Sequence, residues 1–223
     1  MDDSVDGIDY RFRDPALLAE ALTHRSAGSF NNERLEFLGD SILGTVIAAR
    51  LFERHPEASE GDMSRMRARL VRGTTLAEVA AGMDLGRRIQ MGEGERKSGG
   101  YRRSSILADA YEALLGAIFL DGGFDACRAV ILARFDPLID ALPHIDELKD
   151  AKTRLQEWLQ GRGRPLPEYL LLEETGADHR KSFRVACRLS DAELQTEQSG
   201  GSRRQAEQAA AARMLDLLHA AEH

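Results

Sequence analysis

Three acidic residues share one helix face in the stretch NNERLEFLGDSIL, residues 31–43. Glu33, Glu36 and Asp40 stand at positions i, i+3 and i+7, and they project from one strip because a helix turns about 100° per residue. Bulky apolar residues flank the strip. We therefore expect these acids on a helix that packs into the protein interior.

A second stretch, ILADAYEALLG, repeats the arrangement. Asp109 and Glu112 are i, i+3 neighbours, and Ser105 and Gly116 extend their strip with small side chains that leave room for a facing helix or a ligand. Carboxylates that face one another repel unless they share protons or bind a cation. Oxygen ligands without His or Cys favour Mg²⁺ or Mn²⁺ over Zn²⁺, and such sites commonly serve phosphoryl chemistry.

Two other interpretations of the acid strips remain open at this point. The acids could be solvated side chains on exposed helix faces, which is the usual case for a lone i, i+3 pair. They could also belong to a di-iron carboxylate bundle. That site needs Glu-x-x-His on two helices, and neither strip contains a histidine.

The composition is ordinary for a soluble protein, with 43% hydrophobic and 30% charged residues among 223. No apolar run is long enough to span a membrane, and the N-terminus lacks the pattern of a secretory signal. Cys127 and Cys187 lie far apart, so we expect reduced core thiols in a cytoplasmic protein. The net charge of −7 excludes a uniformly basic surface but not nucleic-acid binding, which depends on local clusters.

Residues 14–135 are predicted to be mostly helical. Asp14 followed by a proline suits the start of a helix, and Thr74 or Thr75 could cap a later one. A glycine-rich loop, GEGERKSGGYRRSS, leads into the second acid helix. That helix ends at a double glycine, and a further helix follows over about residues 125–142.

The pattern changes after residue 142, where residues 143–150 are predicted to form a linker. A short amphipathic helix, DAKTRLQEWLQ, is followed by three strand-like segments, PEYLLLEETG, RKSFRVACRLS and AELQTEQSG. An alanine-rich helix ends the chain. The order α-β-β-β-α implies an antiparallel sheet with both helices on one face.

Basic residues gather in two segments between the acid strips. Each cluster alone is most often a solvated face, but beside an acidic metal site both could hold the backbone of an anionic polymer without reading its sequence. The residues are Arg65, Arg67, Arg69, Arg72, Arg96, Lys97, Arg102 and Arg103.

The stretch NNERLEFLGDSIL closely resembles the nine-residue motif of bacterial ribonuclease III. The resemblance extends through EGDMSRMRARLVRG and SGGYRRSSILADAYEALLGAIFLD, and the α-β-β-β-α tail resembles the family's double-stranded RNA-binding domain. It spans about residues 8–219. It implies a mainly α endonuclease domain over residues 1–146, followed by an α+β double-stranded RNA-binding domain over residues 150–221.

The resemblance also implies an Mg²⁺-dependent endoribonuclease, with Mn²⁺ as a possible substitute. The family's four metal-binding carboxylates map onto Glu36, Asp40, Asp109 and Glu112, and we expect Asp40 and Glu112 to be the most indispensable for catalysis. Attack of a metal-activated water on the phosphodiester would give 5′-phosphate and 3′-hydroxyl ends with a short 3′ overhang.

Two further acids match the family pattern. Glu33 and Glu60 correspond to acids near the dimer interface and the active-site valley, although Glu33 could simply favour the helix dipole. His24, in LTHRS, also matches a family motif and is interpreted as structural.

Similar enzymes are homodimers through the endonuclease domain, and they process rRNA and other structured transcripts. We expect double-stranded RNA as the partner, and no membrane. The alternative is a non-catalytic double-stranded RNA-binding protein of the same fold. Such a relative should have lost one of the four acids, and all four are present.

In the C-terminal domain the resemblance assigns three RNA-contact regions. Polar side chains on one face of its first helix suit a shallow minor groove: Thr153, Gln156 and Gln160. His179, between the first two strands, would enter a second minor groove. Arg203 and Arg204, at the start of the last helix, would hold phosphates across the major groove.

Two departures from the family pattern could weaken RNA affinity. Ala177 stands in a turn where the family often has proline. Gln205 and Glu207 follow the two arginines where a third basic residue is common. Neither departure touches the carboxylates.

Overall fold

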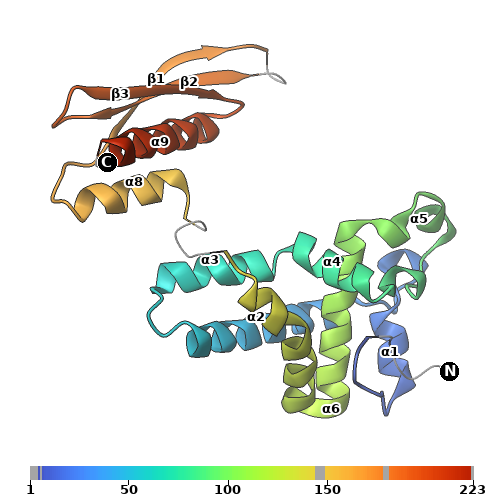
Figure 1. Ribbon diagram of the computed structural model, residues 1–223. Helices are drawn as coiled ribbons and strands as arrows, with labels where there is room; N and C mark the ends of the chain where they lie inside the picture. The colour runs from blue at the N-terminus through green and yellow to red at the C-terminus, as the bar shows by residue number, and fades with distance from the viewer. Residues whose placement is uncertain (1–4, 6, 144–148, 178–180, 222–223) are drawn as a thin grey trace. The chain divides into compact units, whose positions relative to one another are not determined.

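A computed structural model describes residue 5 and residues 7–143, 149–177 and 181–221 of the chain. Its contacts divide the chain into two compact units, Met1–Leu142 and Pro143–His223, each described by itself below. The first unit is helical and the second has the order α-β-β-β-α, which confirms the predicted fold class (Figure 1).

Helices form nearly all of the regular structure in the first unit. They are α1 (Pro15–Ala21), α2 (Glu33–Arg54), α3 (Glu60–Leu70), α4 (Gly73–Gly82), α5 (Glu93–Lys97) and α6 (Ser104–Asp140). As predicted, Asp14 caps α1, because its side chain accepts a hydrogen bond from the Ala16 N–H at 2.9 Å. None of the helices described is long and apolar enough to cross a bilayer.

The two acid helices, α2 and α6, pack against each other through glycine. A Cβ on Gly39 of α2 would overlap the backbone carbonyl oxygen of Glu112 on α6, and a Cβ on Gly116 would overlap the carbonyl oxygen of Leu35. Fully buried Leu43 and Leu114, one from each helix, belong to the core beside this crossing. The backbones of α2 and α6 are therefore in direct contact beside Glu36 and Glu112.

The α6 helix is kinked at Gly123, whose φ of 81° lies in the left-handed region. The double-glycine break predicted here is thus confirmed. The carboxylate of Asp121, just before the kink, accepts hydrogen bonds from the Tyr10 hydroxyl at 2.6 Å and from the backbone N–H groups of Arg13 and Asp14 at 2.8 and 2.9 Å. These hydrogen bonds attach residues 10–14, called the N-terminal strap below, to α6 beside its kink.

Two local predictions are wrong. Neither Thr74 nor Thr75 caps α4, which begins at Gly73 with Arg72 in the N-cap position. The Thr75 hydroxyl instead donates to the carbonyl of Arg69 at 3.0 Å, so it hydrogen-bonds to the backbone at the C-terminal end of α3. The glycine-rich loop is also partly helical, because it contains α5 and a 3-10 turn.

The first acid helix is only partly interior, contrary to the expectation from its apolar flanks. Ile47 and Leu51 of α2 are fully buried, whereas Phe37 and Phe52 are 77% and 71% exposed. Exposed phenylalanines of this size need a partner surface or a functional reason.

The second unit is a three-stranded antiparallel sheet with two helices. Its elements are α8 (Ala151–Gln160), β1 (Glu168–Thr175), β2 (Ser182–Leu189), β3 (Leu194–Gly200) and α9 (Arg203–Ala220). The strand order is β1-β2-β3, and both helices lie on the same side of the sheet, as predicted (Figure 1). Leu155, Leu159 and Met214 are at the centre of the core. Cys187 here and Cys127 in the first unit are buried free thiols.

Replacement of Gly39 by alanine tests the crossing of α2 and α6. Alanine normally stabilises a helix relative to glycine by about 1 kcal/mol. Gly39→Ala should instead lower the free energy of unfolding by about 1–3 kcal/mol, because its Cβ has no space against Glu112. Urea titration of the full chain measures the difference.

Gly44→Ala is the matched control, because it lies on the same helix and its Cβ would meet nothing within 4 Å. That variant should be as stable as the unmodified chain or slightly more stable. Equal stability of the two variants would contradict the packing described here.

Candidate active site

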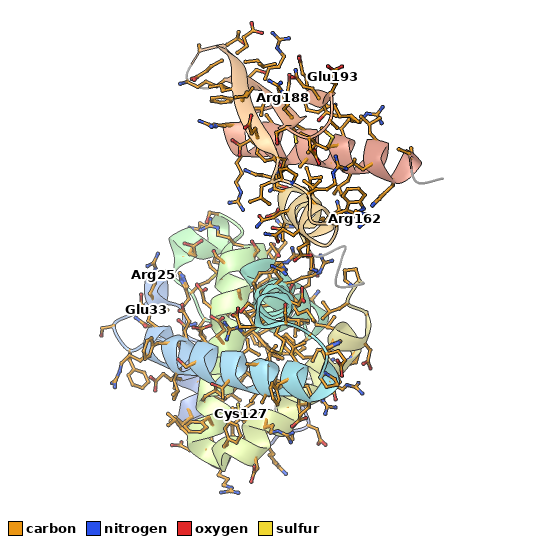
Figure 2. The ribbon with its side chains drawn as sticks, turned by 90° about the vertical axis from the view of Figure 1, so that its left-hand side faces the viewer. Arg25, Glu33, Cys127, Arg162, Arg188 and Glu193 are labelled. Carbon is orange, nitrogen blue, oxygen red and sulfur yellow. The ribbon has the colours of Figure 1, made fainter. Side chains whose placement is uncertain are left out.

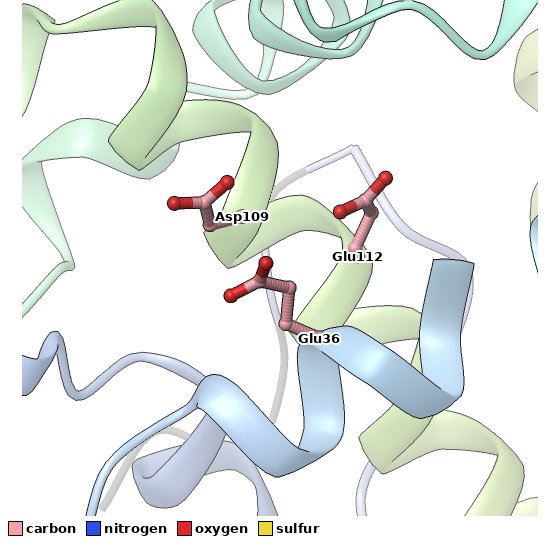
Figure 3. A group of neighbouring side chains, drawn as sticks. All are labelled: Glu36, Asp109 and Glu112. Atoms are coloured by element: carbon pink, nitrogen blue, oxygen red, sulfur yellow. The ribbon is translucent and has the colours of Figure 1, made fainter. Parts of the chain in front are cut away.

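Three of the predicted carboxylates converge between the two acid helices. Glu36 of α2 and Asp109 and Glu112 of α6 each offer a carboxylate oxygen, and these oxygens lie within 4.8 Å of one another (Figure 3). All three side chains are half-buried. Because Mg²⁺ binds oxygens at about 2.0–2.1 Å, oxygens on opposite sides of one ion are about 4.2 Å apart. The group fits a single divalent cation after small side-chain movements.

Electrostatics inside the group favour protonation when no cation is bound. Burial, with the charges of Asp40, Glu36 and Asp109, raises the pKa of Glu112 from 4.5 to about 8. Burial also raises the pKa of Glu36 and of Asp109. Positive charge must therefore be supplied for all the carboxylates to ionise together at neutral pH.

Asp40 is not part of the group that the structure brings together. Its side chain is exposed, and the oxygens found within 4.8 Å of one another come only from Glu36, Asp109 and Glu112 among the described residues. Its charge nevertheless raises the pKa of Glu112, ahead of the charges of Glu36 and Asp109. Asp40 therefore borders the group, and its role as a ligand stays a prediction.

A polar pocket of about 400 Å³ opens beside the group, with Glu36 and Asp109 on its wall. Across it, the Arg103 guanidinium lies 2.8 Å from the carboxylate of Glu95. Sequence reasoning did not single out Glu95, because it lies in a segment predicted to be loop. Only its membership in the acidic run GEGE could have drawn notice.

Further polar side chains line this pocket. Glu33 lines it, 3.8 Å from the Arg25 guanidinium (Figure 2). Asn32 also lines it and is only 2% exposed, and its Nδ2 has no hydrogen-bond partner among the residues that the structure describes. His24 is buried, and its Nδ1 accepts the Ser26 N–H at 3.2 Å, so it caps a short 3-10 helix. It also lines this pocket, and its interpretation as structural stays a prediction.

Glu60 is not brought to the carboxylate group. It is the first residue of α3, and its carboxylate accepts a hydrogen bond from the Ser64 hydroxyl at 2.8 Å. It lines a different pocket, together with Phe52 and Arg67. Its predicted functional role therefore stays a prediction.

The structure describes five of the six predicted RNA-contact residues of the second unit, and their contacts with RNA stay a prediction. Thr153 is half-buried and Gln156 and Gln160 are exposed along α8. Arg203 and Arg204 are exposed in the first turn of α9, whose N-cap Ser202 accepts the Gln205 N–H at 3.2 Å. His179 lies outside the described residues.

Comparisons with known proteins match both units. Residues 14–138 match a family model described as Ribonuclease-III-like, and residues 151–218 match the double-stranded RNA binding motif. Ribonuclease 3 of Alkalilimnicola ehrlichii is 58% identical over 213 residues, which cover 96% of this chain and 93% of that protein. Ribonuclease 3 of Dechloromonas aromatica is 56% identical over 211 residues, which cover 95% of each.

Solved structures match the first unit. The nuclease domain of ribonuclease III from Campylobacter jejuni is 41% identical, with a TM-score of 0.57, and the match covers 60% of this chain and 92% of that one. A second structure of that domain, 43% identical with a TM-score of 0.55, is described for flexibility in a region involved in dimer formation; its match covers 57% of this chain and 92% of that one. The chain therefore belongs to the ribonuclease III family of endoribonucleases and carries a double-stranded RNA binding motif in its second unit.

Proposed function

We propose that the chain is an Mg²⁺-dependent endoribonuclease that hydrolyses double-stranded RNA to 5′-phosphate and 3′-hydroxyl ends, with a short 3′ overhang. The observation that carries the proposal is the convergence of Glu36, Asp109 and Glu112 within 4.8 Å. We assign the endonuclease domain to residues 1–146 and the RNA-binding domain to residues 150–221. Its substrates are rRNA precursors and other structured transcripts in the cytoplasm.

The carboxylates hold and orient the reacting groups. A divalent cation bound by Glu36, Asp109 and Glu112 would lower the pKa of an attacking water and neutralise charge that develops on the phosphate. Mn²⁺, which has similar ligand preferences, could replace Mg²⁺. Asp40, at the border of the group, adds negative charge that strengthens cation binding. Arg103, held by Glu95 across the pocket, lies where RNA backbone phosphate can approach.

The second domain supplies most of the RNA affinity in this proposal. The polar face of Thr153, Gln156 and Gln160 would meet 2′-hydroxyls in the minor groove. Arg203 and Arg204, at the N-terminus of α9, would contact phosphates. Recognition would follow the shape of the duplex more than its sequence.

We also propose that two copies pair through the endonuclease domain. Phe37 and Leu120 are 77% and 54% exposed, and both line an open apolar pocket with Leu38. A symmetric dimer would bury these side chains on both copies. The Campylobacter jejuni nuclease domain, whose described dimer region was noted above, supports this assignment.

Glu112→Gln tests the catalytic assignment. The substitution keeps the shape of the side chain but removes its charge, so cleavage of long duplex RNA in Mg²⁺ should fall by more than about 100-fold. RNA binding measured in chelator should be nearly unchanged, because the second domain supplies most of the RNA affinity in this proposal.

Glu78→Gln, an exposed site on α4, is the matched control and should cleave normally. Cleavage by Glu112→Gln at the rate of this control would refute the assignment. Binding without cleavage by the unmodified chain in Mg²⁺ would favour the non-catalytic alternative.

The raised pKa of Glu112 predicts how stability depends on pH in the absence of metal. Between its unfolded value of 4.5 and its folded value of about 8, the folded chain keeps a proton that the unfolded chain has released. The free energy of unfolding should therefore decrease as pH rises through this window, and divalent metal should restore it.

Thermal melts in chelator and in Mg²⁺, from about pH 5 to about pH 9, measure this effect. Glu112→Gln cannot ionise, so it should lose less stability over the window than the unmodified chain. An equal loss in both proteins would show that another group is responsible.

Phe37→Asp tests the proposed dimer. Burying a phenylalanine contributes about 1.5–3 kcal/mol, and a symmetric dimer buries two, so its dissociation constant should rise by about 100-fold or more. Phe52→Asp changes an equally exposed phenylalanine of the same helix and should leave the dimer intact. Sedimentation of both variants decides the question, and a dimer that survives Phe37→Asp would place the interface elsewhere.

A further inference from the structure

Glu207 lies among cations at the start of α9, where an acid would be expected to repel RNA. One carboxylate oxygen is 2.7 Å from the Lys152 ammonium of α8, and the other accepts the Arg203 Nε–H at 2.9 Å. Only 13% of the Glu207 side chain is exposed. Both carboxylate oxygens therefore pair with cations, and the carboxylate is largely shielded from solvent and from an approaching RNA.

Lys152 of α8 contacts residues of two other elements, α9 and β1. Besides the ion pair with Glu207, its ammonium lies 4.3 Å from the centre of the Tyr169 ring of β1. Its backbone N–H donates to the side-chain oxygen of Gln208 on α9 at 3.2 Å. A lysine side chain normally loses much conformational freedom when it is fixed, and here the fold has already fixed it.

The position of Lys152 links two of the proposed RNA-contact regions. On α8 it precedes Gln156 by four residues, so the two side chains project within about 40° of each other. Through Glu207 it is joined to Arg203, in the first turn of α9. The cation thus lies between the face proposed for the minor groove and the helix end proposed for phosphate.

We infer that Glu207 is a positioning residue for duplex RNA, which holds Lys152 and Arg203 side by side so that α8 and α9 engage the RNA as one preformed surface, with Lys152 as an additional phosphate contact. This inference rests on the proposed RNA-binding function. An acid at position 207 was expected to weaken RNA affinity. The inference predicts the opposite, because Glu207 fixes two cations in position before the RNA binds.

The test is a double-mutant cycle on the full chain in chelator, where RNA is bound without cleavage. Binding to a duplex of about 30 base pairs, longer than the ~16 that one motif spans, is followed by fluorescence anisotropy at several salt concentrations. Glu207→Gln and Lys152→Met should each weaken binding by about three- to tenfold. The double variant should be no weaker than the worse single variant, because both disrupt one arrangement.

Two further readouts separate positioning from folding or net charge. Lys152→Met should reduce the salt dependence of binding by about one phosphate contact, an effect that loss of stability alone does not produce. Asp216→Asn removes an acid from the exposed far part of α9 and should bind as tightly as the unmodified chain or slightly more tightly. Circular dichroism verifies that each variant is folded.

Each outcome has a defined meaning. If Glu207→Gln behaves like Asp216→Asn, or if the effects of Glu207→Gln and Lys152→Met simply add, Glu207 does not position the cations and the inference is overturned. If the unmodified chain fails to bind the duplex, the proposed function itself is wrong. Weakened binding with the expected non-additivity supports both.

Discussion

Contact between the backbones of α2 and α6 is the constraint on which the first unit depends. Gly39 and Gly116 allow the carbonyl groups of Glu112 and Leu35 to approach positions that any Cβ would occupy. Helices separated by ordinary side chains lie about 8–10 Å apart, and their acidic side chains could then avoid one another. The close crossing removes that freedom, so Glu36 of one helix must share space with the acids of the other.

That shared space explains the unusual electrostatics. Burial and mutual repulsion raise the pKa of Glu112 to about 8, so the metal-free group is an arrangement that the fold tolerates only by keeping a proton. A divalent cation at the proposed site would resolve the conflict better than a proton does, because it would neutralise several carboxylates at once. Helix packing thus holds together like charges that such a ligand would stabilise.

Local patterns in the sequence were sufficient for much of this architecture. The i, i+3 spacing of Asp109 and Glu112 and the cap at Asp14 depend only on nearby residues, and the structure has both as predicted. The position of Asp40 at the border of the carboxylate group could not be predicted, because it depends on the register between two helices. The ion pairs of Glu95 with Arg103 and of Glu207 with Lys152 join residues that are distant in sequence or lie in segments without regular periodicity.

The N-terminal strap has a consequence for the order in which the protein assembles. Tyr10 and Asp121, which it joins, are 111 residues apart in sequence. Contacts of such long range form late, because a large loop must close before they contribute any stability. A nascent chain emerges from the ribosome in the N-to-C direction, so residues 10–14 are made before the kink of α6 with which they pair. The strap therefore becomes fixed only when the helical unit is nearly complete.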